Sequence, residues 1–236
     1  MSDLVLTRRR VLAWLGGLGL AALLPGCAND GDSAAPTAAA TTTGSTTTTA
    51  TTRTVDCMLS PEQTEGPYYI DLDRVRRDIT EGRPGATLEL AVNVVDGDSC
   101  QPISDAAVDI WHCDAEGVYS GVQGDDATFL RGIQMTDSGG EAVFQTIYPG
   151  WYTGRAVHIH VKVHVGGTET YTGQLYFDPG VTEAVYTAEP YNARPGPDTP
   201  NESDGIFAQG GDQTVVSVAP EGDGYGGVVT LGVRRT

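Results

Sequence analysis

Hydrophobic and polar residues alternate along much of the chain after residue 55. In residues 88–95, positions 88, 90, 92 and 94 are Leu or Val, whereas Glu89 and Asn93 lie between them. A period of two is typical of a β-strand with one face on a hydrophobic core. Comparable short runs predict further strands at residues 108–112, 142–147, 158–165, 170–177, 214–218 and 228–233.

Polar, Gly-rich segments separate these runs, as at residues 137–140 (DSGG). Helix-compatible segments are short and lie at residues 72–79 and 181–186. The chain contains 31 Gly and 13 Pro, a composition that does not suit a helical bundle or a coiled coil. The pattern therefore predicts an all-β fold, a β-sandwich with short helices in its loops.

The first 27 residues resemble a targeting signal. Three Arg at positions 8–10 precede an apolar run at residues 11–24, shorter than the roughly 20 residues that span a bilayer. The paired arginines resemble a twin-arginine export signal, a route that carries folded, cofactor-loaded proteins. Residues 24–27 (LPGC) resemble a lipobox with Cys27 as the lipidated residue. We expect export and a lipid anchor to the cell membrane; an ordinary cleaved signal with an unrelated Cys is the alternative.

A second segment, residues 28–54, is rich in Thr and Ala and has no aromatic residue. Such a composition cannot bury enough apolar surface to fold, so we expect a disordered tether. The remaining residues, 55–236, are numerous enough for one core and form the predicted catalytic domain.

The charge of the chain limits its partners. There are 14 Lys and Arg against 31 Asp and Glu, which gives a formal net charge of −17. Such a charge repels phosphate backbones, so we expect no nucleic acid partner. With only 39% hydrophobic residues, the composition also excludes a membrane protein with several spans.

The cysteine count fits an exported protein with at most one disulfide. If Cys27 is lipidated, an odd number remains, namely Cys57, Cys100 and Cys113. Cys57 with Cys100 is the first expectation because both lie in predicted loops, but the sequence leaves the pairing open.

Candidate chemistry concentrates at residues 158–164 (HIHVKVH). The alternation of a strand places His158, His160, Lys162 and His164 on one face. Two histidines at this spacing can bind one metal ion, but such pairs also occur on strand surfaces and in cores. The pattern alone does not decide between these interpretations.

Four separated motifs resemble segments of the intradiol ring-cleavage dioxygenases. They are TEGPYY at residues 64–69, VDIWHCDAEGVYSG at 108–121, FQTIYPGWYTGRAVHIH at 144–160 and GQLYF at 173–177. They follow the order found in the family, which includes catechol, hydroxyquinol and protocatechuate dioxygenases. The chain looks most like the secreted, single-domain branch of this family.

The resemblance implies a mononuclear ferric ion, Fe(3+), bound by Tyr119, Tyr152, His158 and His160. Ferric iron is a hard cation that favours anionic oxygen, and it would lower the pKa of a phenol far below its ordinary value of about 10. Tyr148 matches no ligand position in the family, so we expect it in the pocket or at the surface.

The resemblance also assigns three catalytic residues. Tyr152 would be the ligand that leaves when substrate binds, Gln174 would face the site, and Arg155 would stabilise negative charge on the substrate. An ordinary ion pair with one of the many carboxylates is the alternative for Arg155. His112 is expected as a hydrogen-bonded core residue, and His164 as a residue beyond the site.

The implied activity is cleavage of a catechol-type diol between its two hydroxyls, with O2 as co-substrate and a cis,cis-muconate type diacid as product. Two other functions stay open. One is a β-sandwich binding module without chemistry, and the other is a zinc or copper hydrolase that uses the two histidines and a carboxylate. The connection at residues 153–157 is shorter than in well-studied members, and we expect the Thr-rich segment in place of a helical N-terminal domain. These departures leave the substrate and the oligomeric state open.

Overall fold

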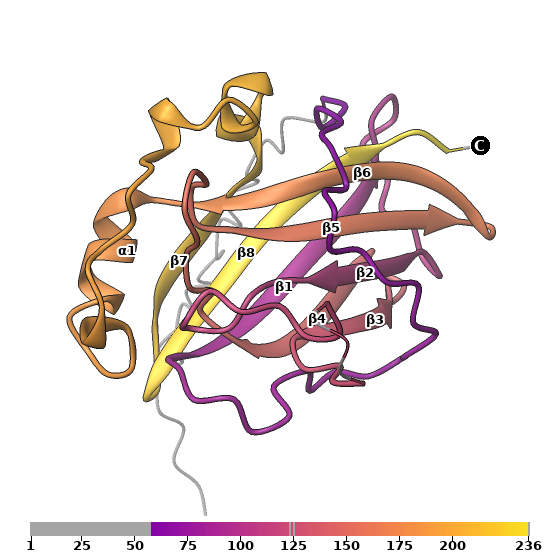
Figure 1. Cartoon of the computed structure of the whole chain (residues 1–236). Coiled ribbons are helices and arrows are strands. Elements are labelled where there is room, and N and C mark those ends of the chain that lie inside the picture. The colour runs from indigo at the N-terminus through magenta and orange to yellow at the C-terminus, as the bar shows by residue number, and fades with distance from the viewer. Residues whose placement is uncertain (1–57, 123, 125, 236) are drawn as a thin grey trace, which may run out of the picture. The chain divides into compact units, whose positions relative to one another are not determined.

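Eight β-strands organise the described part of the chain (Figure 1). The computed structural model describes residues 58–122, 124 and 126–235. The strands are β1 (Thr87–Asp96), β2 (Ala107–Trp111), β3 (Arg131–Met135), β4 (Glu141–Ile147), β5 (His158–Val165), β6 (Thr168–Phe177), β7 (Val215–Glu221) and β8 (Gly224–Val233). The predicted signal and tether lie outside the described residues and stay predictions.

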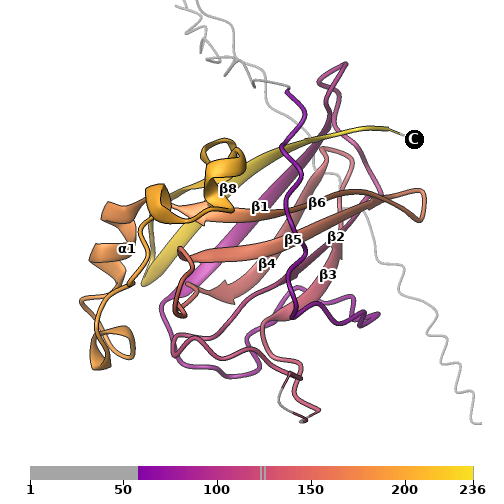
Figure 2. The ribbon, with the colours of Figure 1, turned by 45° about the horizontal axis from the view of Figure 1, so that its top comes forward.

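The strands form two layers that are joined through β7. Their order is β3-β2-β5-β6-β7-β8-β1-β4. Strand β7 pairs in parallel with β6 and antiparallel with β8, so it links the layer of β3, β2, β5 and β6 to the layer of β8, β1 and β4. Figures 1 and 2 show β5 and β6 crossing in front of β1 and β8. The predicted all-β sandwich is confirmed.

The core between the layers contains the alternating apolar positions. Leu90 of β1 is fully buried and belongs to the same core cluster as Ile159 and Val161 of β5. Successive side chains of a strand point to opposite faces, so burying Ile159 and Val161 in this core turns His158 and His160 to the other face of β5. Packing of the core therefore sets the direction of both imidazoles.

The helices of the described part all follow β6. Helix α1 (Pro179–Val185) begins after Asp178, whose carboxylate accepts hydrogen bonds from two backbone N–H groups of the first turn. It confirms the helix expected at residues 181–186. Four 3-10 helices lie between α1 and β7, namely η1 (Tyr191–Ala193), η2 (Asn201–Ser203), η3 (Phe207–Gln209) and η4 (Gly211–Thr214). No helix within the described residues has the length and apolar character needed to cross a bilayer.

Residues 72–79 do not form the helix that the sequence predicts. They run extended along one edge strand of each layer. The backbone N–H of Arg76 donates to the carbonyl of Ile133 in β3 at 3.0 Å, and that of Ile79 donates to Gln145 in β4 at 3.0 Å. Backbone groups that a helix would bond internally are used here to cover exposed sheet edges. Strand β3 itself escapes prediction because its sequence, RGIQM, lacks apolar alternation.

The cysteines are partly accounted for. Cys100 is disulfide-bonded, whereas Cys113 is a free and buried thiol. Burial raises the pKa of Cys113 to about 12, so the thiol stays protonated. Cys57 lies outside the described residues, and its pairing with Cys100 stays a prediction.

Candidate metal centre

The four side chains expected as metal ligands lie together at the start of β5. His158 and His160 come from β5, Tyr119 from the loop after β2, and Tyr152 from the turn before β5. The Nε2 atoms of the two histidines are 3.1 Å apart, and Tyr152 Oη lies 3.2 Å from His158 Nε2. The ring of Tyr119 lies 5.7 Å from that of Tyr152 and 6.1 Å from that of His160, between centroids. Two phenols and two imidazoles thus converge on one point.

His158 is held in the form that binds metals. Its Nδ1 lies 2.6 Å from the carbonyl oxygen of Ala156. A carbonyl only accepts hydrogen bonds, so Nδ1 carries the proton. The lone pair of Nε2 is then free to bind a metal ion and points toward the other candidate ligands. Burial, together with the charge of Arg155, lowers the pKa of His158 to about 3. The imidazole is therefore neutral.

His160 is oriented by packing. Its ring stacks on that of Trp111, with 4.9 Å between centroids and 5° between planes. Its buried Nδ1 has no hydrogen-bond partner. Gly66, at φ +76°, closes on the edge of the imidazole, because a Cβ at that position would lie 3.1 Å from Cε1 of His160. Burial and the neighbouring His158 lower the pKa of His160, which keeps it neutral as well.

The two tyrosines differ in burial. Tyr119 is 6% exposed, and its hydroxyl has no well-aligned hydrogen bond, whereas Tyr152 is half-buried. Burial raises the pKa of both phenols, and the charge of Arg155 opposes this at both. A cation bound at this point would reverse the shift and favour the phenolates. The buried hydroxyl of Tyr119, which lacks a well-aligned partner, and the two neutral imidazoles therefore form a donor set that fits a hard, highly charged metal ion.

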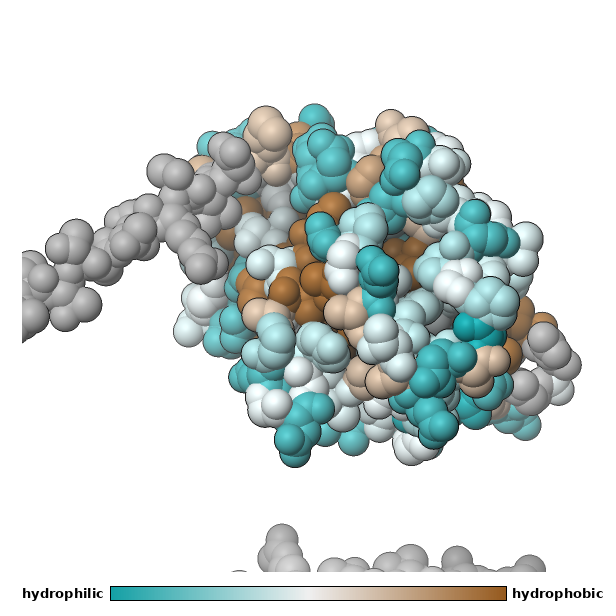
Figure 3. Space-filling view, turned by 90° about the vertical axis from the view of Figure 1, so that its left-hand side faces the viewer, coloured by the Kyte–Doolittle hydropathy of each residue, from teal (hydrophilic) through white to brown (hydrophobic). Residues whose placement is uncertain are grey.

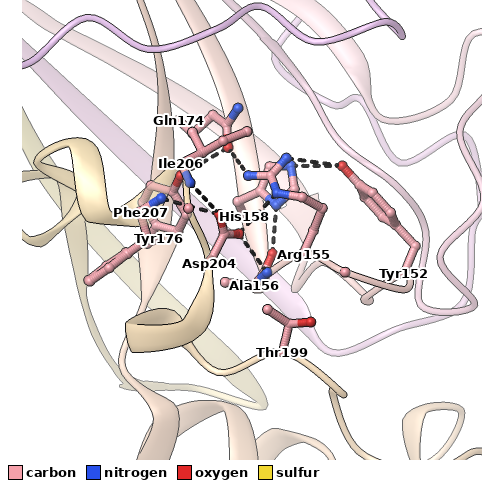
Figure 4. Close-up of polar contacts among 12 residues, drawn as sticks. Tyr152, Arg155, Ala156, His158, Gln174, Tyr176, Thr199, Asp204, Ile206 and Phe207 are labelled. Atoms are coloured by element: carbon pink, nitrogen blue, oxygen red, sulfur yellow. Dashed lines mark hydrogen bonds and ion pairs between the residues drawn. The ribbon is translucent and has the colours of Figure 1, made fainter.

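Arg155 connects the donors to a buried ion pair (Figure 4). Its Nε donates to Asp204 Oδ2 at 2.9 Å, and its Nη2 donates to Gln174 Oε1 at 2.5 Å. Its Nη1 points at Tyr152 Oη at 3.5 Å. The guanidinium thus forms the ion pair that was the alternative for Arg155, and it also reaches the donor cluster; its expected role toward a substrate stays a prediction.

The side chain of Gln174 is fixed next to Arg155 by hydrogen bonds to both its amide oxygen and its amide nitrogen. It is completely buried on β6. Its Oε1 also accepts from the hydroxyl of Tyr176 at 3.0 Å, and its Nε2 donates to the carbonyl of Thr64 at 3.1 Å. With its amide oxygen directed at Arg155, Gln174 holds the guanidinium in place.

Asp204 is the residue of this network that sequence reasoning misses. Its side chain is 1% exposed, and Oδ2 also accepts from the backbone N–H of Ala156 at 2.8 Å. It stands 49 residues after Arg155 in the chain. The only local signal is an Asp followed by Gly205, which is typical of any turn.

A cavity of about 290 Å³ borders the donor cluster, a volume at the lower end for small-molecule sites. Its lining residues are Tyr68, Gly117, Val118, Tyr119, Val122 and Tyr152. A second hollow, of about 370 Å³, lies beside α1, on a face where apolar side chains form a patch among hydrophilic ones (Figure 3). Val157, Phe177 and Tyr186 line this second hollow, but none of the four donors does. The first cavity is therefore the one suited to present a small molecule to the donors.

Two other expected positions have different outcomes. Tyr148 is neither in the pocket nor at the surface, because it is fully buried and its Oη lies 2.7 Å from Thr182 Oγ1. His112 is a hydrogen-bonded core residue, as expected. Its ring nitrogens lie 2.8 Å from the carbonyl of Cys113 and 2.8 Å from Thr146 Oγ1.

No carboxylate joins the two histidines. Within the described residues, no three His, Cys, Asp or Glu side chains gather closely enough to hold one metal ion. Asp204 is occupied by Arg155, and His164 lies beyond a register shift of β5, away from the donors. The described part of the chain therefore lacks the donor set of a zinc or copper hydrolase built on His158, His160 and a carboxylate.

Known structures resemble this one over most of the chain. An intradiol ring-cleavage dioxygenase from Tetranychus urticae is 36% identical, with a TM-score of 0.73, over 75% of this chain and 95% of that one. The dioxygenase domain of a carbohydrate-binding fusion protein from Streptomyces sp. SirexAA-E is 30% identical, with a TM-score of 0.60, over 75% of this chain and 99% of that one.

Sequence comparison identifies the same group. A chlorocatechol 1,2-dioxygenase from Cupriavidus pinatubonensis is 31% identical over 140 residues, which are 49% of this chain and 54% of that protein. The chain thus spans about half the length of the curated relatives that it matches. The profile of the family described as Dioxygenase matches residues 64–188, more than half of the chain and the whole of the donor cluster. With this profile match and these structural neighbours, the chain belongs to the intradiol ring-cleavage dioxygenase family.

Proposed function

We propose that this protein is a non-haem ferric dioxygenase that cleaves catechol-type diols between their two hydroxyls. The observation that carries the proposal is the convergence of two phenols and two neutral imidazoles beside Arg155, at the wall of a cavity. A diol with adjacent oxygens offers two donor atoms to one metal ion. Catechol and O2 have together the composition of the cis,cis-muconate type diacid, so no external reductant is required.

Tyr119, Tyr152, His158 and His160 would hold the ferric ion. Bound there, the ion would take both catechol oxygens and make the aromatic ring reactive toward O2. The protein contributes a dry, preorganised site, since both imidazoles and Tyr119 are almost completely buried. Burial keeps competing water away from the reacting groups.

Tyr152 would accept a substrate proton. Catechol must lose two protons to present two anionic oxygens, and a phenolate at Tyr152 Oη can take one of them. Tyr152 is half-buried and lines the cavity. Tyr119 lines it too but is 6% exposed, so Tyr119 suits a permanent ligand and Tyr152 suits the ligand that leaves.

Arg155 would stabilise the negative charge that develops on the substrate. Its Nη1 lies 3.5 Å from Tyr152 Oη, and its other donor groups are directed away by Gln174 and Asp204. An anchored donor in a buried site needs no reorganisation as the charge appears, and such donors contribute strongly to catalysis.

The substrates that we propose are catechol and its substituted derivatives. The cavity is walled by Val118 and Val122, and Val118 is 39% exposed, so a ring substituent can extend toward solvent. Curated relatives that act on chlorocatechol support substituted rings. The predicted signal at residues 1–27 further supports an exported enzyme tethered to the membrane through Cys27.

The test is metal analysis followed by turnover. We expect one iron per chain, a red solution because phenolate-to-iron charge transfer absorbs visible light, and formation of a muconate that carries both atoms of ¹⁸O₂. Replacing Tyr119 and Tyr152 together by Phe should remove the colour. Stoichiometric zinc or copper in a colourless protein would overturn the proposal, and iron binding without oxygen uptake would indicate a binding module.

A further inference from the structure

The carboxylate of Asp204 is fully used by four hydrogen bonds. Oδ1 accepts from the backbone N–H groups of Ile206 at 2.7 Å and Phe207 at 3.3 Å. Oδ2 accepts from Arg155 Nε at 2.9 Å and from the backbone N–H of Ala156 at 2.8 Å. Oδ1 thus binds the backbone at the start of η3, and Oδ2 binds the segment before β5 (Figure 4).

Both partners of Oδ2 act on the donor cluster. The guanidinium of Arg155 points its Nη1 at Tyr152. The backbone of Ala156 makes two hydrogen bonds: its N–H donates to Asp204, and its carbonyl accepts from Nδ1 of His158. A single buried carboxylate is therefore connected to two predicted ligands, to Tyr152 through Arg155 and to His158 through Ala156.

We propose that Asp204 is a positioning residue of the site, which directs the Arg155 guanidinium toward Tyr152 and orients His158 through the backbone of Ala156. The inference rests on the proposed function, because it assigns a task to groups that would bind the metal and the substrate. It also connects η2 and η3 to the reaction site, although they are distant from it in sequence.

The charge of Asp204 suits this task. Burial alone would raise its pKa, but the hydrogen bonds from Ala156 and Ile206 and the charge of Arg155 outweigh burial and lower it. The carboxylate is thus ionised and balances a largely buried guanidinium. Without this partner, Arg155 would be a buried, unpaired cation. Because an unpaired buried charge is costly, we expect its side chain to turn toward water.

Asp204→Asn is the sharpest test, because it keeps the size and one carbonyl oxygen. With that oxygen at the start of η3, the new NH₂ group faces two N–H donors and cannot accept from either. Asp198→Asn is the matched control. Asp198 is exposed, and its carboxylate accepts from the N–H of Gly154 at 3.1 Å, so it holds the same turn from the solvent side.

The readouts are iron content, the visible spectrum and anaerobic binding of 4-nitrocatechol to the iron-loaded proteins. We expect Asp204→Asn to bind iron but to bind 4-nitrocatechol about tenfold more weakly and to turn catechol over about tenfold more slowly, as supporting partners do in other metal sites. Asp198→Asn should stay within about twofold of wild type. Asp204→Glu, which restores the charge, should recover part of the affinity and serves as the second variant if Asp204→Asn does not fold.

A double-mutant cycle with Arg155→Lys separates positioning from stability. If Asp204 acts through Arg155, the combined variant should lose little more affinity for 4-nitrocatechol than Arg155→Lys alone. Additive losses would overturn the role assigned through Arg155, and equal behaviour of Asp204→Asn and Asp198→Asn would overturn the whole inference. A wild-type protein that binds iron but does not oxidise catechol would contradict the proposed function instead, so the two failures are distinguishable.

Discussion

Trp111 and His160 lie face to face, with their ring planes 5° from parallel and their centroids 4.9 Å apart. Metal-binding histidines are commonly oriented by a hydrogen bond to the second ring nitrogen. His160 Nδ1 has no such partner. The imidazole of His160 is instead oriented by stacking on Trp111. Trp111 is 1% exposed, and the ring of Tyr69 packs against it.

Replacing Trp111 tests this relationship. We expect Trp111→Leu to lose iron to a chelator about tenfold faster than wild type, because the imidazole is then free to rotate. Trp111→Phe keeps an aromatic face and should retain most of the metal affinity. Chelator competition followed by the visible absorbance measures both. Equal iron loss from the Leu and Phe variants would show that stacking does not orient His160.

The two tyrosines should respond differently to loss of their hydroxyls. Tyr152→Phe is expected to keep iron through the other three residues, with paler colour, but to bind catechol slowly because the proton acceptor is missing. Tyr119→Phe should bind iron weakly, because it loses the more buried phenol. Anaerobic mixing with catechol in a stopped-flow instrument measures the rates. If Tyr152→Phe binds catechol as fast as wild type, the assignment of roles is wrong.

Asp109 should give the stability of the protein a dependence on pH. It is 6% exposed, and burial raises its pKa to about 7, assisted by Asp71 and opposed by Tyr69, Arg131 and Lys162. Between about pH 4 and 7 the unfolded chain ionises this group while the folded protein keeps it protonated, so its contribution to stability falls as pH rises. Above pH 7 the contribution is constant.

Asp109→Asn cannot ionise, so its free energy of unfolding relative to wild type should rise between pH 4 and 7. The rise is limited to about 4 kcal/mol by the size of the shift. Urea unfolding at a series of pH values measures it, with Asp98→Asn as an exposed control. A difference between Asp109→Asn and wild type that does not change with pH would show that Asp109 ionises as it does in the unfolded chain.

The predicted export signal can be tested in cells. Changing Arg8 and Arg9 to Lys should leave the precursor in the cytoplasm, because a twin-arginine signal depends on that pair. Cys27→Ala should release protein that is otherwise found with membranes, since the lipid would have no attachment point. Fractionation and immunoblotting report both results. Unchanged membrane attachment of the Cys27→Ala protein would rule out the lipid anchor.

The cavity wall should control how large a substrate can be. We expect 4-methylcatechol and 4-chlorocatechol to have kcat/KM values within about tenfold of that of catechol, since Val118 leaves the cavity open to solvent. Val118→Trp should reduce turnover of the substituted rings more than that of catechol. Steady-state oxygen uptake compares the three substrates. Strict selectivity of the wild type for one of them would contradict the proposed breadth.

The sequence by itself determined the class of fold and the identity of the candidate ligands. A period of two is a local property of a strand with one buried face, so strands such as β1 and β5 can be located without tertiary information. The same alternation places His158 and His160 on one face of β5. The motifs around Tyr119 and Tyr152 point to the remaining donors through resemblance to a family.

Only the tertiary structure decided which residues support these donors. Asp204 reaches Arg155 across 49 positions of the chain, and the stacking of Trp111 on His160 joins two neighbouring strands. The segment at residues 72–79 is extended because it meets the edges of β3 and β4, whereas its own composition is compatible with a helix. Tyr148 is a core residue because the ring of Phe177 packs against it. Each of these outcomes depends on a partner distant in sequence, and local periodicity carries no information about such partners.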